Sequence, residues 1–270
     1  MKDIEDVRDY WDRQPCNIKR SNSEPGSILW CMDTEENKYF VEPHIPEQAE
    51  FKKWSGKRVL EIGCGIGITA CSFAKHGAYV TAIDLSEKSL RLAKIRADLH
   101  GVTDRIKFHQ GNAEELDKIV PLEKYDLIWS FGVIHHSPNP EKIVDNIKKY
   151  MAVHTELRIM VYNKMSWKVF WIFLRYGMGA FWRIDKLIAD HSEAQTGCPV
   201  TFTYTKKSVQ GLLKNLEIRK VSIEHIFPYR IKDYIQHSYV KVWYFRWMPE
   251  NWFKWLEKKL GWHLCVTASL

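Results

Sequence analysis

Short apolar runs recur along the first 163 residues of the chain and alternate with longer, partly polar segments. The runs at 58–62, 79–84, 106–110, 125–130 and 157–162 have the length and composition of buried strands. Segments 69–76 and 86–99 follow the first two runs and have the length of helices. This alternation predicts an α/β domain, and a chain of 270 residues can bury a large core.

The first apolar run ends in a glycine-rich turn. Glu61 stands at the end of the strand, and glycines follow at 63, 65 and 67. Glycine permits unusual backbone angles and lets the chain approach a ligand without an intervening side chain. The helix behind the turn offers free backbone N–H groups, which suit the polar parts of a nucleotide. Dinucleotide-binding sites use G-x-G-x-x-G, whereas the third glycine here comes one position early.

The early third glycine, together with the preceding acidic residue, resembles the class I S-adenosylmethionine-dependent methyltransferases. In that family the turn wraps the amino-acid half of S-adenosylmethionine. Asp84 supports the resemblance, because it ends the next strand 21 residues after Gly63. A carboxylate at that point can accept hydrogen bonds from both ribose hydroxyls. The residues alone leave open a nicotinamide or flavin site, and an Asp84 that only caps the following helix.

The resemblance implies further contacts to the cofactor. Asn112 and Ala113 match the segment that holds the adenine ring, although the family usually has Asp at the position of Asn112. The amide oxygen of Asn112 can accept a hydrogen bond from the exocyclic amine without offering a charge. A role confined to the loop is the alternative. The full predicted cofactor-binding set is Glu61, Gly63, Gly65, Gly67, Asp84, Leu85, Asn112, Ala113 and Ser130.

Two adjacent histidines, His135 and His136, follow the fourth run. Ligands of α/β sheets bind outside the carboxyl ends of the strands, so the resemblance places both histidines at the reaction centre. Methyl transfer is an in-line displacement in which alignment does most of the work. For a hydroxyl acceptor a neutral imidazole suits a general base, and His135 is slightly preferred. With a thiolate or amine acceptor the rings would position the substrate, and either ring could instead pack or cap the loop.

The leader before the core contains aromatic residues that suit a lid. Tyr10 and Trp11 could close over the methionine end of the cofactor and exclude water, as leaders of related enzymes often do. An aromatic anchor that holds the leader on the domain surface is the other interpretation. Tyr162, at the end of the fifth run, completes the predicted substrate-binding set. The proline-glycine-glycine turn that commonly precedes this strand in the family is absent, so the local turn shape stays open.

The resemblance also implies the domain organisation. We expect a doubly wound, seven-stranded, mostly parallel sheet with an antiparallel last strand, and aromatic helical insertions that form a lid. The two late strands are expected at 218–227 and 262–270. The expected parts are a leader or lid at 1–50, the cofactor-binding core at 51–163, an aromatic helical insertion at 164–217, and the final strands at 218–270 with an aromatic insertion at 228–261.

Eight of the twelve tryptophans follow residue 164, in two aromatic stretches outside the minimal core. The first stretch has apolar residues at helical spacing on one face: Trp167, Phe170, Trp171, Leu174, Met178 and Phe181. Charged residues interrupt it, which argues against a membrane-spanning helix. A substrate lid, a subunit interface between identical chains and a helix lying on a membrane surface are the three interpretations.

The second aromatic stretch, at 239–256, is interleaved with Lys and Arg. Such a pattern can bind nucleic acid, but it more often packs. Methyltransferases that act on base amino groups usually carry an Asn/Asp-Pro-Pro-aromatic motif after the fourth strand, and residues 130–133 read Ser-Phe-Gly-Val instead. A nucleic-acid substrate is therefore not expected. The net charge of +7 permits an acidic partner without specifying one.

The cysteines give no sign of a disulfide framework or a metal site. The six cysteines form no C-x-x-C pair and no zinc-like cluster, so we expect a reduced, cytoplasmic protein without a metal. The first 20 residues are charged throughout and lack the apolar segment of a signal peptide.

These patterns together predict an S-adenosylmethionine-dependent methyltransferase that acts on a small molecule and releases S-adenosylhomocysteine. Three alternatives remain. A methyltransferase for a lipid or quinone would dock at a membrane surface through the aromatic helix. A non-catalytic protein would bind S-adenosylmethionine as a sensor. A nicotinamide-dependent oxidoreductase would use the same glycine turn for another nucleotide.

Overall fold

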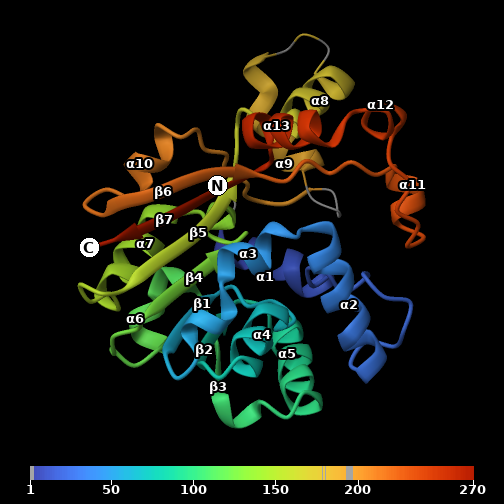
Figure 1. Cartoon of the computed structure of the whole chain (residues 1–270). Coiled ribbons are helices and arrows are strands. Elements are labelled where there is room, and N and C mark those ends of the chain that lie inside the picture. The colour runs from blue at the N-terminus through green and yellow to red at the C-terminus, as the bar shows by residue number, and fades with distance from the viewer. Residues whose placement is uncertain (1–2, 178, 180, 193–196) are drawn as a thin grey trace.

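The fold is centred on one sheet. A computed structural model of the chain describes residues 3–177, 179, 181–192 and 197–270. Within these residues, seven strands form a sheet in the order β3-β2-β1-β4-β5-β7-β6 (Figure 1). Their bounds are β1 (Arg58–Ile62), β2 (Tyr79–Asp84), β3 (Ile106–Gln110), β4 (Leu127–Phe131), β5 (Glu156–Tyr162), β6 (Glu217–Glu224) and β7 (His263–Ser269). β1 to β5 pair in parallel, and β7 runs antiparallel to β5 and β6. The predicted fold, including both late strands, is confirmed.

The strand register brings several chain segments to the carboxyl edge of the sheet. β7 is antiparallel, so its first residue, His263, pairs with Tyr162 at the end of β5 and with Glu224 at the end of β6. Ile62, the last residue of β1, pairs with Ile83, which lies one residue before the end of β2. The carboxyl edge therefore extends from the glycine turn to the two late strands.

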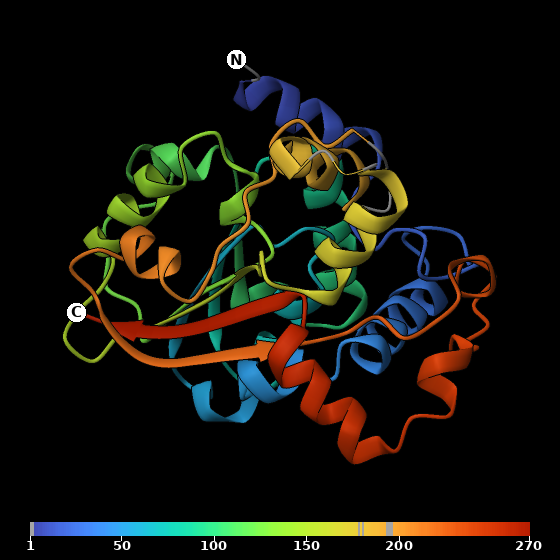
Figure 2. The same cartoon turned by 90° about the horizontal axis from the view of Figure 1, so that it is seen from above.

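Helices cover both faces of the sheet (Figures 1 and 2). They are α4 (Ile68–Lys75), α5 (Glu87–Leu99), α6 (Leu116–Ile119), α7 (Pro140–Lys149) and α10 (Ser208–Leu212). On one face Leu60 and Ile128 belong to a buried cluster that includes residues of α6, α7 and α10. On the other face Val59 and Trp129 pack in a cluster with residues of α4 and α5. The alternation along β1 and β4 thus fills two cores, as expected for strands buried on both faces.

The leader forms α1 (Ile4–Arg13), α2 (Ile28–Val41) and α3 (His44–Ala49). Arg96 of α5 joins α2 to the glycine turn and is completely buried. Its guanidinium donates hydrogen bonds to the Cys31 carbonyl (2.7 Å), the Thr34 hydroxyl (2.6 Å) and the Ile66 carbonyl (3.0 Å). A buried charge is tolerated only when its donors are satisfied in this way. α2 is therefore an integral part of the core, and a lid role within the leader is left to α1.

The first aromatic insertion contains α8 (Trp167–Tyr176) and α9 (Ile184–His191). The helix expected to continue through Phe181 ends at Tyr176, so that part of the prediction was wrong; Met178 lies outside the described residues. Gly177 caps the helix, and Gly179 has a φ of +81°, which a helix cannot continue through. α8 buries Val169 and Ile172, while the predicted aromatic face is largely exposed.

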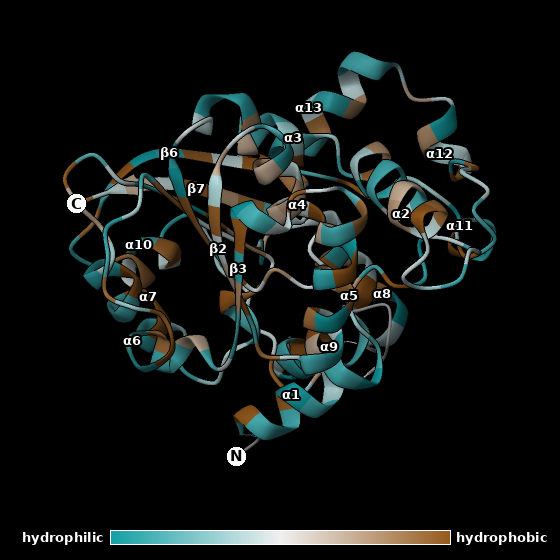
Figure 3. Cartoon of the chain, turned by 90° about the horizontal axis from the view of Figure 1, so that it is seen from below, coloured by the Kyte–Doolittle hydropathy of each residue, from teal (hydrophilic) through white to brown (hydrophobic). Residues whose placement is uncertain are grey.

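The second insertion contains α11 (Ile231–Tyr234), α12 (Trp243–Arg246) and α13 (Glu250–Leu260). Four of its tryptophans are at least 63% exposed: Trp243, Trp247, Trp252 and Trp255. The helices that surround the sheet mix hydrophobic and hydrophilic positions (Figure 3). Among the described residues, no helix is long and apolar enough to cross a membrane.

Candidate active site

The glycine turn connects β1 to α4, and each of its glycines has a positive φ: +75° at Gly63, +53° at Gly65 and +77° at Gly67. Added methyl groups would meet different surroundings. A Cβ on Gly63 would lie 2.1 Å from a methyl of Val133, and one on Gly67 would lie 2.9 Å from the Cβ of Ala93. No atom lies within 4 Å of a Cβ built on Gly65. Gly63 and Gly67 therefore permit close packing, whereas Gly65 borders open space.

Asp84 is held directly beside this turn. Its carboxylate accepts hydrogen bonds from the backbone N–H groups of Gly65 (2.7 Å) and Ser86 (2.9 Å). Burial raises the pKa of Asp84 to about 6, although these backbone donors pull in the opposite direction. The alternative that Asp84 caps the following helix was wrong, because Ser86 is the N-cap of α5 and its side chain accepts the Ser89 N–H. Each carboxylate oxygen of Asp84 can still accept a further donor.

Glu61 adds a second buried carboxyl at the same place. Its Oε2 atom has no hydrogen-bond partner among the described residues. Burial, with a smaller contribution from nearby Asp84, raises the pKa of Glu61 to about 8. A buried carboxyl with an unsatisfied oxygen destabilises its surroundings unless a ligand compensates it. Glu61 and Asp84 together favour a ligand that brings positive charge or hydrogen-bond donors.

The loop after β3 lies next to Asp84, because the Gly111 N–H donates to the Asp84 carbonyl at 3.0 Å. Asn112 caps a short helical turn, η3 (Ala113–Glu115), by accepting the Glu114 N–H at 2.9 Å. The cap uses one acceptor site of the amide oxygen and leaves its NH2 group available as a donor. Leu85 and Ala113 are half-buried beside these polar groups.

Glu114 holds the loop after β4 in place, a role that was not predicted from the sequence. This buried carboxylate accepts hydrogen bonds from the Ser137 hydroxyl (2.5 Å), the Asn139 backbone N–H (3.2 Å) and the Asn139 side chain (2.9 Å). The loop after β3 is thereby fastened to the loop that follows the two histidines. No periodic pattern or motif marks such a long-range contact in the sequence.

His135 and His136 lie on η4 (Ile134–His136), the short helical turn after β4, and both are buried. The ring of His135 lies 3.8 Å from the ring of Tyr162 and 4.2 Å from that of His136, measured between centroids. Burial lowers the pKa of His135 well below its ordinary value. The structure therefore brings the predicted catalytic histidines and Tyr162 together, with His135 enclosed by its neighbours.

His136 is oriented by a backbone carbonyl. Its Nδ1 atom lies 2.9 Å from the Val200 oxygen, which can only accept, so Nδ1 carries the hydrogen. In the neutral ring the basic lone pair is then on Nε2. The ring also makes an edge contact with Trp11 of α1, with centroids 5.3 Å apart. Trp11 in turn packs on buried Tyr10. Trp11 thus reaches the predicted reaction centre, and Tyr10 packs behind it.

Segment 197–204 passes beside His135 and Tyr162, and this position was also not predicted from the sequence. Phe202 donates its N–H to the His135 carbonyl (2.8 Å), and Tyr204 donates to the Tyr162 carbonyl (2.7 Å). These bonds fix the first insertion to the ends of β4 and β5. Ser130, on β4 itself, is fully buried, and its hydroxyl has no partner among the described residues.

Residues 53–215, more than half of the chain, match the family described as a methyltransferase domain. The chain belongs to the methyltransferase-domain family. It resembles a ubiquinone biosynthesis O-methyltransferase of Bordetella parapertussis, with 42% identity over 92 residues, which are 33% of this chain and 36% of that protein. A relative of the same name from Psychrobacter cryohalolentis is 34% identical over 144 residues, which cover 53% of this chain and 55% of that protein.

The fold of this methyltransferase-domain protein also resembles that of a solved structure. Magnesium protoporphyrin IX methyltransferase from Synechocystis PCC 6803, with bound S-adenosylhomocysteine, aligns with a TM-score of 0.58 over 98% of this chain and 99% of that one, at 14% identity. The matches to the curated relatives span only about a third to a half of their length. The comparisons confirm the predicted family and fold, and they agree with S-adenosylmethionine as the cofactor.

Proposed function

We propose that this protein transfers a methyl group from S-adenosylmethionine to a hydroxyl oxygen of a small-molecule acceptor. The observation that carries the proposal is the open space at Gly65, beside the half-buried carboxyl of Asp84 and the buried carboxyl of Glu61. The backbone can approach a ligand closely there, and both carboxyls require donors or positive charge. S-adenosylmethionine supplies ribose hydroxyls, an ammonium group and a sulfonium.

The predicted cofactor residues other than the fully buried Ser130 have roles that suit their positions. Asp84 accepts the ribose hydroxyls, while the unsatisfied oxygen of Glu61 faces the positively charged methionine end. The adenine ring rests against Leu85 and Ala113, beside the amide of Asn112. Gly63 and Gly67 act indirectly, because they let the Val133 loop and α5, through Ala93, pack closely around the turn.

The acceptor side contains the groups for proton removal. An oriented His136, with its lone pair on Nε2, suits the general base that a hydroxyl acceptor needs. His135 has a lowered pKa and is enclosed by Tyr162 and His136, which suits positioning better than proton transfer. The sequence slightly favoured His135 as the general base, and the proposal now assigns that role to His136. Trp11 and segment 197–204 exclude water from the centre, which strengthens polar interactions there.

Calorimetry with S-adenosylhomocysteine and, separately, NADH tests the cofactor. We expect S-adenosylhomocysteine alone to bind. Binding of NADH alone would refute the methyltransferase assignment in favour of an oxidoreductase. A search of cell extract for methylated products, with isotopically labelled donor, then finds the acceptor; absence of any turnover would favour a sensor.

His136→Gln and His135→Gln form a matched pair for the base. General base catalysis contributes about 10²–10⁴-fold, so His136→Gln should lower kcat by that order with S-adenosylhomocysteine affinity preserved. His135→Gln should lower kcat less and leave the shape of the pH–rate profile unchanged. An equal loss in both variants, with unchanged pH profiles, would contradict a base role for His136.

A lipid or quinone acceptor is a second candidate, favoured by the exposed tryptophans of α12 and α13. Lys and Arg interleave with these tryptophans, a composition typical of helices that lie on anionic membrane surfaces. Flotation with anionic vesicles should carry the wild type upward, and the double variant Trp243→Ala/Trp247→Ala should remain below. Leu122→Ala, which removes an exposed apolar residue near the start of β4, is the control.

If the wild type stays in the lower fraction, the proposal that this protein docks on a membrane to reach a lipid or quinone acceptor fails. The same aromatic surface could join identical chains, and a concentration-dependent mass in sedimentation experiments would indicate that arrangement. The cytoplasmic location stays a prediction. Its test is fractionation of the source cells.

A further inference from the structure

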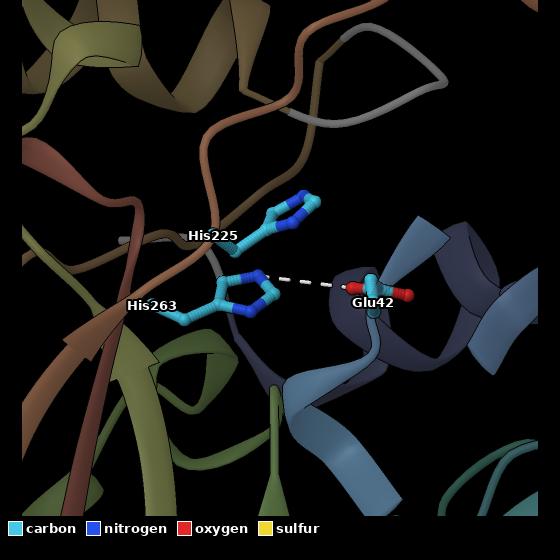
Figure 4. Close-up of side chains that lie close together, drawn as sticks. All are labelled: Glu42, His225 and His263. Atoms are coloured by element: carbon cyan, nitrogen blue, oxygen red, sulfur yellow. Dashed lines mark ion pairs between the residues drawn. The ribbon is translucent and has the colours of Figure 1, made fainter. Parts of the chain in front are cut away.

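Glu42, His225 and His263 converge from three segments that lie far apart in the sequence (Figure 4). Glu42 follows α2, His225 follows β6, and His263 begins β7. One potential ligand atom from each residue lies within 4.8 Å of the other two. The leader and the two late strands thus meet at a cluster of side chains of the types that bind metals. No spacing in the sequence predicts this cluster.

The carboxylate of this cluster is held in place and kept charged. One oxygen of Glu42 accepts a hydrogen bond from the Arg20 guanidinium at 2.8 Å. Burial alone would raise the pKa of Glu42, but the charge of Arg20 and smaller contributions from other nearby basic groups together outweigh it and lower the pKa to about 2. The other oxygen, Oε1, faces Nε2 of His263 at 3.9 Å.

A further histidine orients His263. Nε2 of His44 and Nδ1 of His263 are hydrogen-bonded at 2.8 Å. When His263 is the donor, its lone pair is on Nε2, the atom that faces Glu42. Ligating histidines usually donate their other ring N–H to such a partner, which fixes the tautomer. Burial lowers the pKa of both His225 and His263, so both rings are neutral, the form that binds metals.

The distances leave room for an ion. Oε1 of Glu42 and Nε2 of His263 are too far apart at 3.9 Å for a hydrogen bond. Two ligands on a tetrahedral zinc, at bond lengths of about 2.0–2.2 Å, lie roughly 3.3–3.5 Å apart. Closing this gap by about half an ångström would bring the two atoms to that separation, and the ligand atom of His225, which lies within 4.8 Å of both, would move closer as well.

We propose that Glu42, His225 and His263 bind one divalent transition-metal ion of the zinc class. Two imidazoles and a carboxylate form a donor set that suits zinc and leaves a fourth position for water or another oxygen ligand. The ion joins the leader to β6 and β7. It lies close to the acceptor side, because the His263 ring is 6.3 Å from that of Tyr162. The proposal does not depend on the methyl acceptor.

The test uses the full chain, stripped of metal with a chelator and titrated with Zn²⁺ in a calorimeter. We expect one equivalent to bind tightly and to raise Tm. Glu42→Gln, His225→Asn and His263→Asn should each abolish this binding. Removal of the orienting residue in His44→Asn should weaken it by about 10–100-fold. His154→Asn is the matched control, because exposed His154 also lies beside a carboxylate, that of Asp126.

Cobalt substitution separates this site from the cysteines. Co²⁺ in the wild type should show visible d–d bands without a thiolate charge-transfer band, and the bands should disappear in His225→Asn. Circular dichroism of the metal-free variants verifies that they are folded. If a histidine variant unfolds, Glu42→Gln replaces it in the test, because this substitution keeps the size of the side chain. Failure to bind stoichiometric Zn²⁺, or undiminished binding in the folded variants, would reduce the cluster to a hydrogen-bonded network and overturn the proposal.

Discussion

The carboxyl edge of the sheet has two halves that are built in different ways. The cofactor half consists of loops that directly follow β1, β2 and β3, and its residues occur within a continuous stretch from Glu61 to Ala113. The acceptor half, beyond β4, combines the loop after β4 with Trp11 from the leader, Phe202 from an insertion, and the start of β7. The first half is local in sequence, whereas the second exists only once distant segments have packed together.

This difference has a consequence for function. A change in the leader or in the first insertion reaches the acceptor half directly, because Trp11 and Phe202 contact the loop after β4. The curated relatives match only 33–53% of this chain.

The largest expected effect in the cofactor half comes from Gly63→Ala. The added methyl would overlap Val133 at a positive φ, so the free energy of unfolding should fall by about 2–5 kcal/mol. S-adenosylhomocysteine affinity should fall by two orders of magnitude or more in the protein that remains folded. Chemical denaturation and calorimetry measure the two effects.

Gly65→Ala and Gly101→Ala form the control pair for this experiment. Both glycines have a positive φ and open space around the built Cβ, so each variant should lose about 1–2 kcal/mol of stability. Only Gly65→Ala should lose cofactor affinity. Equal affinities in the two variants would place the cofactor away from the turn.

Asp84→Asn should have the next largest effect. Hydrogen bonds to a charged acceptor contribute roughly 1.5–3 kcal/mol, so S-adenosylhomocysteine affinity should fall by about 10–100-fold. Because the pKa of Asp84 in the free protein is raised to about 6, wild-type affinity should weaken as the pH falls through that value and the carboxylate becomes protonated.

Calorimetry between pH 5 and 8 measures this dependence, which Asp84→Asn should reduce. Exposed Asp104, at the turn before β3, provides the control Asp104→Asn. A wild-type affinity that stays constant below pH 6 would show that the ligand does not need the ionised carboxylate.

Trp11→Ala should have the smallest effect of the three and should act on the other half. The edge contact between Trp11 and His136 is of a kind that contributes about 0.5–1.5 kcal/mol, so kcat/KM should fall by about 2–10-fold. Affinity for S-adenosylhomocysteine should change little. Steady-state kinetics with the acceptor found in extract give the measurement, and exposed Trp255→Ala is the control. A loss confined to cofactor affinity would assign Trp11 to the cofactor half.

The sequence, with the family resemblance that its motifs carry, predicted the sheet and its antiparallel last strand, and it placed most of the predicted cofactor residues at the ends of β1, β2 and β3 or in the loops that follow them. Apolar runs specify strands, and glycines before a helix specify a turn, because both depend on residues that are neighbours in the chain. His135 and His136 were located for the same reason. The end of α8 at Tyr176 was not predicted, because the apolar periodicity continues to Phe181, whereas the glycines after Tyr176 end the helix.

Only the tertiary structure decided how the acceptor half is assembled. Glu114 reaches Ser137 and Asn139, the Val200 carbonyl orients His136, and Glu42 meets His225 and His263. These contacts join residues that are 23 to more than 200 positions apart in the sequence. Their geometry depends on helix lengths, strand register and burial throughout the fold. Local patterns carry no information about such distances, which is why the donor can be deduced from the sequence and the acceptor side cannot.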